Sequence, residues 1–295
     1  MASGQQRRDN VAAIGWMLLA VGALSLMDGV MKWLSPHYPP LQIAALRAIV
    51  SLPIVLVWVA LGGGFRQVLT RRPVLHLARG ALSVLMLGAF IYTVRVLPLA
   101  DAYSIFFVSP LLITALSVPI LGERVDGRRW AAIAVGLLGV LVVLRPGASA
   151  LTLAAVAPLV AAACYSLSAI SMRVLGRTDS TLSMMFWFVV LVALGAGALA
   201  APTWVPVSRA HWPMLVALAI LGASGQFAIT EAFRRGEVSV VAPFEYTALA
   251  WGIALDWAVW STRPDAPMLA GAAIIVAAGL YLIRRERTHI EAEHP

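Results

Sequence analysis

Long apolar segments separated by short polar turns run the length of this 295-residue chain. A helix needs about 20 apolar residues to cross the roughly 30 Å of hydrocarbon in a bilayer, and ten segments reach or approach that length. They lie at residues 11–34, 41–61, 74–95, 99–121, 130–144, 151–174, 182–201, 212–233, 238–260 and 268–283. The pattern predicts an all-α membrane protein with ten transmembrane helices, joined by turns rich in Gly, Pro and Arg.

Proline interrupts the fourth of these segments. Two prolines lie inside residues 99–121, Pro110 among them, and each removes a backbone hydrogen bond and clashes with the preceding helical turn. Within a bilayer such a break is tolerated where neighbouring groups bind the freed carbonyls, often beside a cavity. The ninth segment also contains a proline, Pro243. We predict that both helices bend, at Pro110 and at residues 243–246, around a central cavity.

The two halves of the chain repeat one another. Residues 99–121 correspond to residues 235–257 at an offset of 136. Each copy contains five predicted helices, in residues 1–147 and 148–295. An odd number of spans makes the second copy enter the membrane from the opposite face, so the sequence predicts two inverted five-helix repeats. Such repeats are common in secondary transporters, with the substrate site near the midplane.

Composition excludes several classes of protein. Apolar residues make up 61% of the chain and charged residues 12%, too few charges to cover a water-soluble surface. The net charge of +8 comes from arginines that lie singly or in pairs between apolar blocks, so the lipid bilayer, and no nucleic acid, is the expected partner. Cys164 is the one cysteine. With no metal-binding spacing and no phosphate-binding glycine loop, we expect no cofactor, no metal and no enzymatic activity.

Positive charge predicts the orientation of the helices. In the predicted topology, fifteen Lys and Arg residues lie on the side of the N-terminus and five on the other side. Cytoplasmic loops carry the excess of such residues. We therefore expect a multi-pass protein of the cell inner membrane with both termini in the cytoplasm.

The chain resembles the drug/metabolite transporter superfamily, in particular its ten-span EamA type. The resemblance covers nearly all of residues 11–285 and is carried by the duplicated unit, by Asp28–Trp33 (DGVMKW) and by Leu121–Arg124 (LGER). The second copy departs from the pattern, with Ala258–Trp260 in place of Gly-Glu-Arg. Members include exporters of amino acids and other metabolites, and importers of nucleotide-like compounds or vitamins.

Three charged residues lie inside or at the ends of the first two predicted helices. Asp28 and Lys32 are four residues apart, hence on one helix face where they can pair, and Arg47 lies about two turns into the next helix from the same side. Ionisable groups inside a membrane are expensive and are functional candidates. In one interpretation the three residues form an outer gate or hold a zwitterion. In the other, Asp28 and Lys32 are a structural ion pair, and Arg47 extends its charged end toward the membrane interface.

Glu245 is the acid that lies deepest in a predicted helix without a nearby sequence partner. It stands seven residues into the ninth segment, roughly 10 Å from the end at 1.5 Å per residue. We favour a cavity-facing role for this carboxylate over a buried pair with an arginine. Asp256 lies nearer a helix end, and its expected role is structural.

Polar aromatic and hydroxyl side chains complete the predicted site. A mostly apolar cavity lined by such groups suits an amphiphilic solute, whereas the alternative for each single residue is a hydrogen bond between helices. The predicted substrate-binding residues are Tyr92, Tyr103, Pro110, Tyr165, Ser168, Gln226, Glu245, Tyr246 and Trp251. For His76 and Arg79, at the cytoplasmic end of the third helix, we expect contact with solvent or lipid headgroups.

The fifth and tenth predicted helices contain glycines and no internal charge. Gly136 and Gly139 lie in one, Gly271 and Gly279 in the other. Small residues let membrane helices approach closely, so we interpret both helices as scaffold and as a homodimer contact.

These observations favour a secondary transporter of small organic metabolites that works by alternating access. Within that class, the polar aromatic residues favour export of amino acids, including aromatic ones, and the alternative is uptake of a nucleotide-like or vitamin-like metabolite. An intramembrane enzyme would need a cluster of catalytic groups, which the scattered acids do not supply. A membrane scaffold would not explain Asp28 or Glu245.

Overall fold

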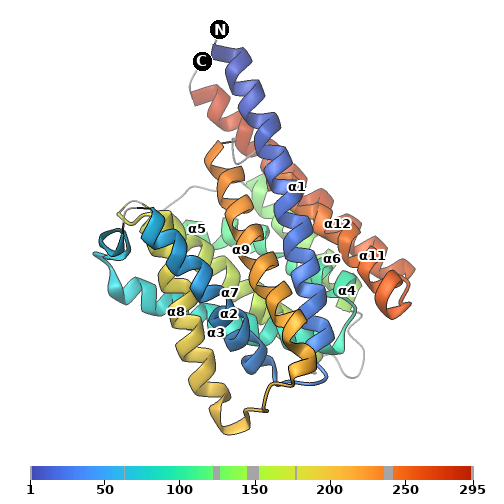
Figure 1. Ribbon diagram of the computed structural model, residues 1–295. Helices are drawn as coiled ribbons and strands as arrows, with labels where there is room; N and C mark the ends of the chain where they lie inside the picture. Colours follow the sequence, from blue (N-terminus) through green and yellow to red (C-terminus); the bar gives the residue numbers. More distant parts are fainter. Residues whose placement is uncertain are drawn as a thin grey trace. The chain divides into compact units, whose positions relative to one another are not determined.

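The computed structural model describes residues 2–62, 64–121, 127–144, 153–176, 178–235 and 242–293, and all regular secondary structure in these ranges is helical (Figure 1). The α-helices are α1 (Ala2–Leu34), α2 (Pro40–Leu61), α3 (Pro73–Val96), α4 (Leu99–Phe106), α5 (Ser109–Leu121), α6 (Gly127–Leu144), α7 (Leu153–Leu175), α8 (Thr181–Ala200), α9 (Trp212–Arg235), α11 (Ala248–Trp260) and α12 (Ala266–Glu293). The 3₁₀ helices are η1 (Phe65–Val68), η2 (Ala201–Thr203), η3 (Arg209–His211) and η4 (Ala242–Thr247).

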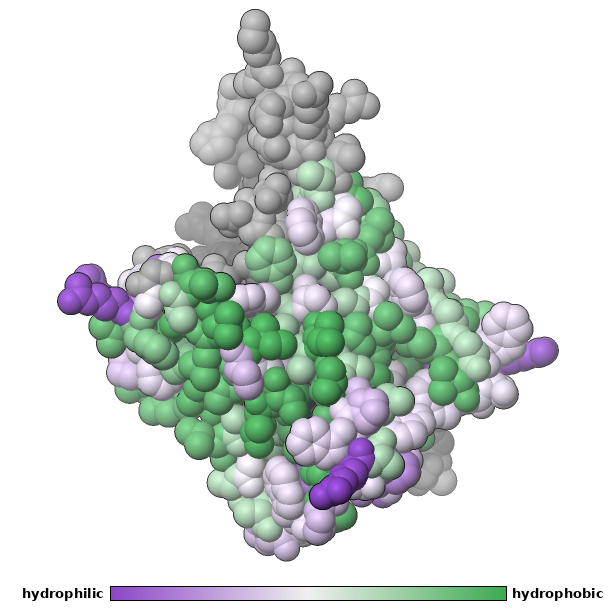
Figure 2. Space-filling model, viewed as in Figure 1, coloured by the Kyte–Doolittle hydropathy of each residue, from purple (hydrophilic) through white to green (hydrophobic). Residues whose placement is uncertain are grey.

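Apolar side chains cover much of the surface, as Figure 2 shows for one face. Within the described ranges, six helical stretches are long and apolar enough to cross a membrane, and three shorter apolar helices accompany them. Large side chains in helix interiors point outward, such as Leu194 and Leu199 on α8 and Trp257 on α11, all more than 60% exposed. This arrangement confirms an all-α membrane protein. The count of ten spans and the inversion of the repeats stay predictions.

The chain packs into two compact units. Unit 1 consists of residues 1–26, 98–152 and 224–295, and unit 2 of residues 27–97 and 153–223. Each unit combines segments from both halves of the sequence. The repeats predicted from the sequence are a different division of the chain and stay a prediction.

In unit 1, α6 packs along α12, and α4 packs against α11. Gly139 and Gly271 lie where α6 and α12 meet: a Cβ on Gly139 would lie 2.8 Å from the side chain of Ile275 and 3.0 Å from the carbonyl oxygen of Gly271. The close approach explains why the sequence has glycine here. These glycines serve a contact within the chain, and the homodimer contact stays a prediction.

In unit 2, α2 packs along α8, and α3 packs against α7 and α8. The expectation for the start of α3 is wrong: His76 and Arg79 are only 2% and 8% exposed. His76 Nε2 lies 2.8 Å from Oδ2 of Asp179, which precedes α8, and Arg79 donates to the carbonyl of Met184 on α8 at 3.0 Å. His76 therefore contacts Asp179, 103 residues away in the sequence, and not the solvent or lipid headgroups that we expected.

Candidate functional site

The fourth predicted helix is interrupted directly before Pro110. Helix α4 ends at Phe106 and α5 begins at Ser109. Pro110 has no N–H to donate to the carbonyl four residues earlier, and the chain instead closes a tighter turn in which Val108 N–H donates to the Ile105 carbonyl at 3.1 Å. The predicted break is confirmed, while the side chain of Pro110 lies outside the described part.

Residues 243–246 of the ninth predicted helix depart from regular α-helix, as expected. Residues Ala242–Thr247 form the 3₁₀ helix η4, and α11 begins only at Ala248. The hydroxyl of Thr247 donates to the carbonyl of Phe244 at 2.6 Å, which satisfies one backbone acceptor of this turn. Glu245 and Tyr246 therefore lie on a tight turn and not on a continuous helix.

Aromatic rings connect the two interrupted segments in unit 1. The rings of Tyr103 and Phe107 lie 6.4 Å apart and nearly parallel at 23°, and those of Phe107 and Tyr246 meet edge to face at 5.0 Å and 81°. These separations suit favourable aromatic pairing. We call these three residues the aromatic ladder. Tyr103 also packs on α11, where a Cβ on Gly252 would lie 2.8 Å from its ring.

The hydroxyl of Tyr246 is buried and has no hydrogen-bond partner within the described residues. It points at Gly279 of α12, where an added Cβ would overlap it. Leaving a buried hydroxyl unpaired costs about 1–3 kcal/mol. Such a group at an aromatic site is suited to bind a polar group of a ligand.

Other predicted residues of unit 1 lie on neighbouring elements. Glu245 is half-buried on η4, next to Tyr246, and Gln226 is half-buried on α9. Trp251 of α11 packs against α1, because a Cβ on Gly22 would lie 3.1 Å from its ring. Unit 1 thus places a carboxylate, a phenol and several aromatic rings around two helix breaks.

The remaining predicted residues belong to unit 2. Arg47 and Asp28 interact electrostatically and are both half-buried, so this part of the predicted charged group comes together. This contact fits both the gate and the structural ion pair. The unit 2 set comprises Asp28, Lys32, Arg47, Tyr92, Tyr165 and Ser168. The unit 1 set comprises Tyr103, Pro110, Gln226, Glu245, Tyr246 and Trp251.

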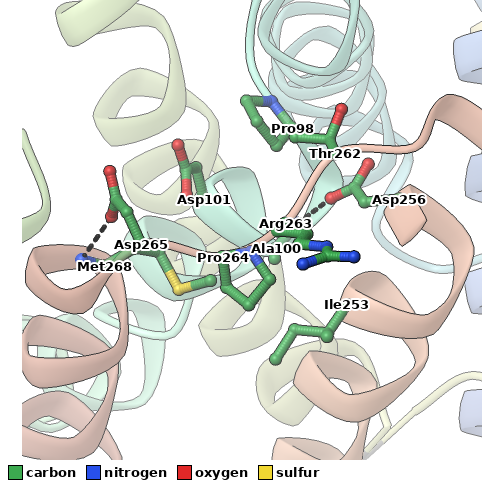
Figure 3. A pocket seen from close by; sticks show the side chains of 10 residues that line it. All are labelled: Pro98, Ala100, Asp101, Ile253, Asp256, Thr262, Arg263, Pro264, Asp265 and Met268. Carbon is green, nitrogen blue, oxygen red and sulfur yellow. Dashed lines mark hydrogen bonds between the residues drawn. The ribbon is translucent and has the colours of Figure 1, made fainter.

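A polar cavity of about 180 Å³ opens in unit 1 where α4, α11 and α12 approach one another (Figure 3). Two of its acids cap helices: Asp256 Oδ2 accepts the Ala100 N–H at 2.9 Å, and Asp265 Oδ1 accepts the Met268 N–H at 3.0 Å. Carboxylates at helix N-termini are stabilised by the exposed N–H groups and the helix dipole. Asp256 therefore has the expected structural role. No residue of the predicted substrate site lines this cavity.

Sequence reasoning missed three functional candidates. Phe107 completes the aromatic ladder, and its signal was its place three residues before Pro110. Asp179 holds His76, and Arg263 lines the polar cavity. Neither of these charged side chains lies in an apolar segment, so neither stands out in the sequence as an intramembrane charge.

Long apolar helices, two interrupted spans and a cluster of polar aromatic residues define a multi-pass membrane protein of the transporter class. The chain belongs to the EamA-like transporter family, whose model matches residues 11–145 and again residues 152–285. Membership in the drug/metabolite transporter superfamily is thereby confirmed, as is the prediction that the protein is not an enzyme.

Relatives along the whole chain are transporters of small organic molecules. An S-adenosylmethionine uptake transporter of Rickettsia conorii is 27% identical over 291 residues, which cover 96% of each chain. A pseudopaline exporter of Pseudomonas aeruginosa is 28% identical over 273 residues, covering 92% of this chain and 95% of that one. A riboflavin transporter of Vibrio cholerae is 26% identical over 275 residues, covering 92% of each.

A protein of known crystal structure shares the fold. The two chains superpose with a TM-score of 0.65 at 20% identity, over 94% of this chain and 97% of the other. This likeness shows the fold, while the family match and the relatives assign the chain to the transporters of small metabolites.

Proposed function

We propose that the chain is a secondary transporter for a small metabolite with a heteroaromatic or aromatic ring, and that it works by alternating access. Its ten spans form two inverted five-helix repeats in the inner membrane, with both termini in the cytoplasm. The single observation that carries the proposal is the aromatic ladder of Tyr103, Phe107 and Tyr246, which joins two interrupted helices beside Glu245.

The ladder suits a planar ring for an energetic reason. Stacking of one base on an aromatic side chain is worth about 1–3 kcal/mol. The unpaired hydroxyl of Tyr246 and the carboxylate of Glu245 can then bind a donor or a positive charge on the same molecule. Such a pocket grips an amphiphilic solute by packing at one end and by hydrogen bonds at the other.

The relatives favour one of the two cargo classes. S-adenosylmethionine and riboflavin both contain a fused heteroaromatic ring, so the names of those relatives favour a nucleotide-like or vitamin-like cargo. Amino acids, above all aromatic ones, are the second candidate. They would present a ring to the ladder and an ammonium group to Glu245.

The interrupted helices supply the hinges for alternating access. Where a helix lacks its regular hydrogen bonds, a rotation of the backbone breaks fewer contacts than in a continuous helix. The sequence contains no motif for binding a nucleoside triphosphate. Transport is therefore driven by the gradient of the cargo or of a proton.

Counterflow in proteoliposomes tests the function. Vesicles loaded with unlabelled S-adenosylmethionine, riboflavin or tryptophan receive the labelled compound outside, and we expect saturable exchange for at least one of them. Tyr246→Ala should abolish that exchange because it removes both ring and hydroxyl. Tyr281→Ala is the matched control, since Tyr281 is an exposed aromatic on α12, and it should keep the exchange. Wild-type exchange by folded Tyr246→Ala protein would refute the assigned site.

A further inference from the structure

Two sets of contacts fasten the two ends of α2 and α8 within unit 2. The first, which we call the His76 clasp, joins η1 and the start of α3 to the start of α8. The carbonyl of Val68 accepts Trp187 Nε1–H at 2.9 Å and the Ser183 hydroxyl at 3.3 Å. His76 Nε2 lies 2.8 Å from Asp179 Oδ2, and the two side chains are 2% and 1% exposed.

The second set, the His211 clasp, joins the start of α2 to the segment after α8. Gln42 forms a pair of bonds with the backbone of Val205: Nε2–H donates to the carbonyl at 2.6 Å, and Oε1 accepts the N–H at 2.9 Å. The Tyr38 hydroxyl lies 2.7 Å from His211 Nδ1 and accepts the Ser208 N–H at 3.1 Å.

The two clasps are the same arrangement made twice, with the roles of the two halves of the chain exchanged. Tyr38 and Asp179, which hold the histidines, are 141 residues apart, as are the donors Gln42 and Ser183. The accepting carbonyls are 137 residues apart. In one clasp the first half of the chain supplies the carbonyl, and in the other clasp the second half does. This exchange is what an inverted repeat produces.

We propose that the clasps are a matched pair of pH-responsive fasteners: protonation strengthens the His76 clasp and weakens the His211 clasp. The reason is the chemistry of the partner. An imidazolium and a carboxylate form a charge-assisted hydrogen bond. At the other end His211 Nδ1 faces the hydroxyl of Tyr38, a neutral group that also accepts the Ser208 N–H, and we assign this O–H as the donor to Nδ1. In that arrangement Nδ1 carries no proton, and protonation removes the bond that Nδ1 accepts.

The surroundings of His76 keep its partner charged. Burial alone raises the pKa of Asp179, but side-chain hydrogen bonding, that with His76 included, outweighs burial and holds the pKa below its ordinary value. Arg79, one turn further along α3, donates to a backbone carbonyl of α8 at 3.0 Å. A proton on His76 therefore meets a carboxylate that already carries its charge.

The contacts around His211 are aromatic rings and a phenol hydroxyl. Its ring lies 4.6 Å from the ring of His37 and 5.3 Å from that of Trp33. Lys32 at the end of α1 and Arg209 on η3 are the fixed charges of the adjoining segments. A positive charge on His211 gains no carboxylate from these neighbours, so acid loosens this clasp.

Hydrogen exchange of the full chain in nanodiscs, measured at pH 7.5 and 5.5 and corrected for the intrinsic rate, tests the proposal. Val205 and Ser208 donate their amides to the His211 clasp, so protection of residues 205–208 should fall about tenfold on acidification, the effect of one such hydrogen bond. Residues 65–70, held by the His76 clasp, should gain protection in the same sample. If acidification changed the protection of both segments in the same direction, or changed neither, the proposal would be overturned.

Variants assign the effects to the two histidines. His211→Gln should make residues 205–208 insensitive to pH, while His37→Gln, which alters the neighbouring ring only, should keep the acid-induced loss. His76→Gln and Asp179→Asn should each remove the acid-induced gain in protection at residues 65–70. If one of these variants does not fold, the other tests the role of the His76 clasp. An unchanged pH response in His211→Gln would refute the role of His211. These measurements need no cargo, so their outcome is independent of the transport assay.

Discussion

Gly279→Ala places a methyl group where the Tyr246 hydroxyl lies. A Cβ on Gly279 would overlap that oxygen and would lie 2.7 Å from Cζ of the same ring. The ring cannot simply retreat, because Phe107 packs against it at 5.0 Å between centroids. Since protein interiors are close-packed, one added methyl must displace the ring or separate η4 from α12.

The expected cost follows from that overlap. Adding a methyl to a packed site typically destabilises by about 1–3 kcal/mol, which corresponds to an apparent melting temperature lower by about 2–4 °C for each kcal/mol. Displacement of Tyr246 should also weaken cargo binding, because the ladder loses its edge-to-face pair. Adding Tyr246→Phe should relieve part of the cost, since it removes the hydroxyl but leaves Cζ too close.

Thermal unfolding in detergent and counterflow in proteoliposomes measure the two effects. Gly197→Ala is the matched control: it is also a glycine within a helix, α8, and a Cβ there meets no atom within 4 Å. Replacing glycine by alanine in an open helical position stabilises by at most about 1 kcal/mol. If Gly279→Ala and Gly197→Ala behaved alike in both assays, the contact between Tyr246 and α12 would be wrong.

Three further predictions concern hinge, coupling and topology. Pro110→Ala should join α4 and α5 into one helix and slow counterflow more than it lowers stability, and unchanged turnover would count against a hinge. Glu245→Gln should abolish proton-driven accumulation, because the amide cannot titrate, but keep exchange of an uncharged cargo, because the amide still forms hydrogen bonds. Accumulation at the wild-type rate would exclude this residue as the coupling site, and loss of both activities in folded protein would make it a direct cargo ligand. In a Cys164→Ala background, thiol reagents should reach Pro36→Cys, at an exposed position, from outside and Arg71→Cys only from inside. The reverse accessibility would refute the predicted orientation.

The sequence by itself determined the class of the protein and the places where helices break. Both follow from local physics: an apolar segment of sufficient length belongs in a bilayer, and a proline such as Pro110 cannot donate to the preceding turn wherever the helix lies. The family resemblance was equally accessible, because it rests on the duplicated pattern and on short motifs. These properties do not depend on which helices become neighbours.

Tertiary structure alone decided which of the candidate side chains meet. His76 was expected at a polar surface, but Asp179 reaches it from a distant segment and both become buried. Phe107 is one more apolar residue in the sequence, and only the meeting of α4 with η4 makes it part of the aromatic ladder. Such contacts depend on how segments far apart in the chain pack, and no local periodicity encodes that choice.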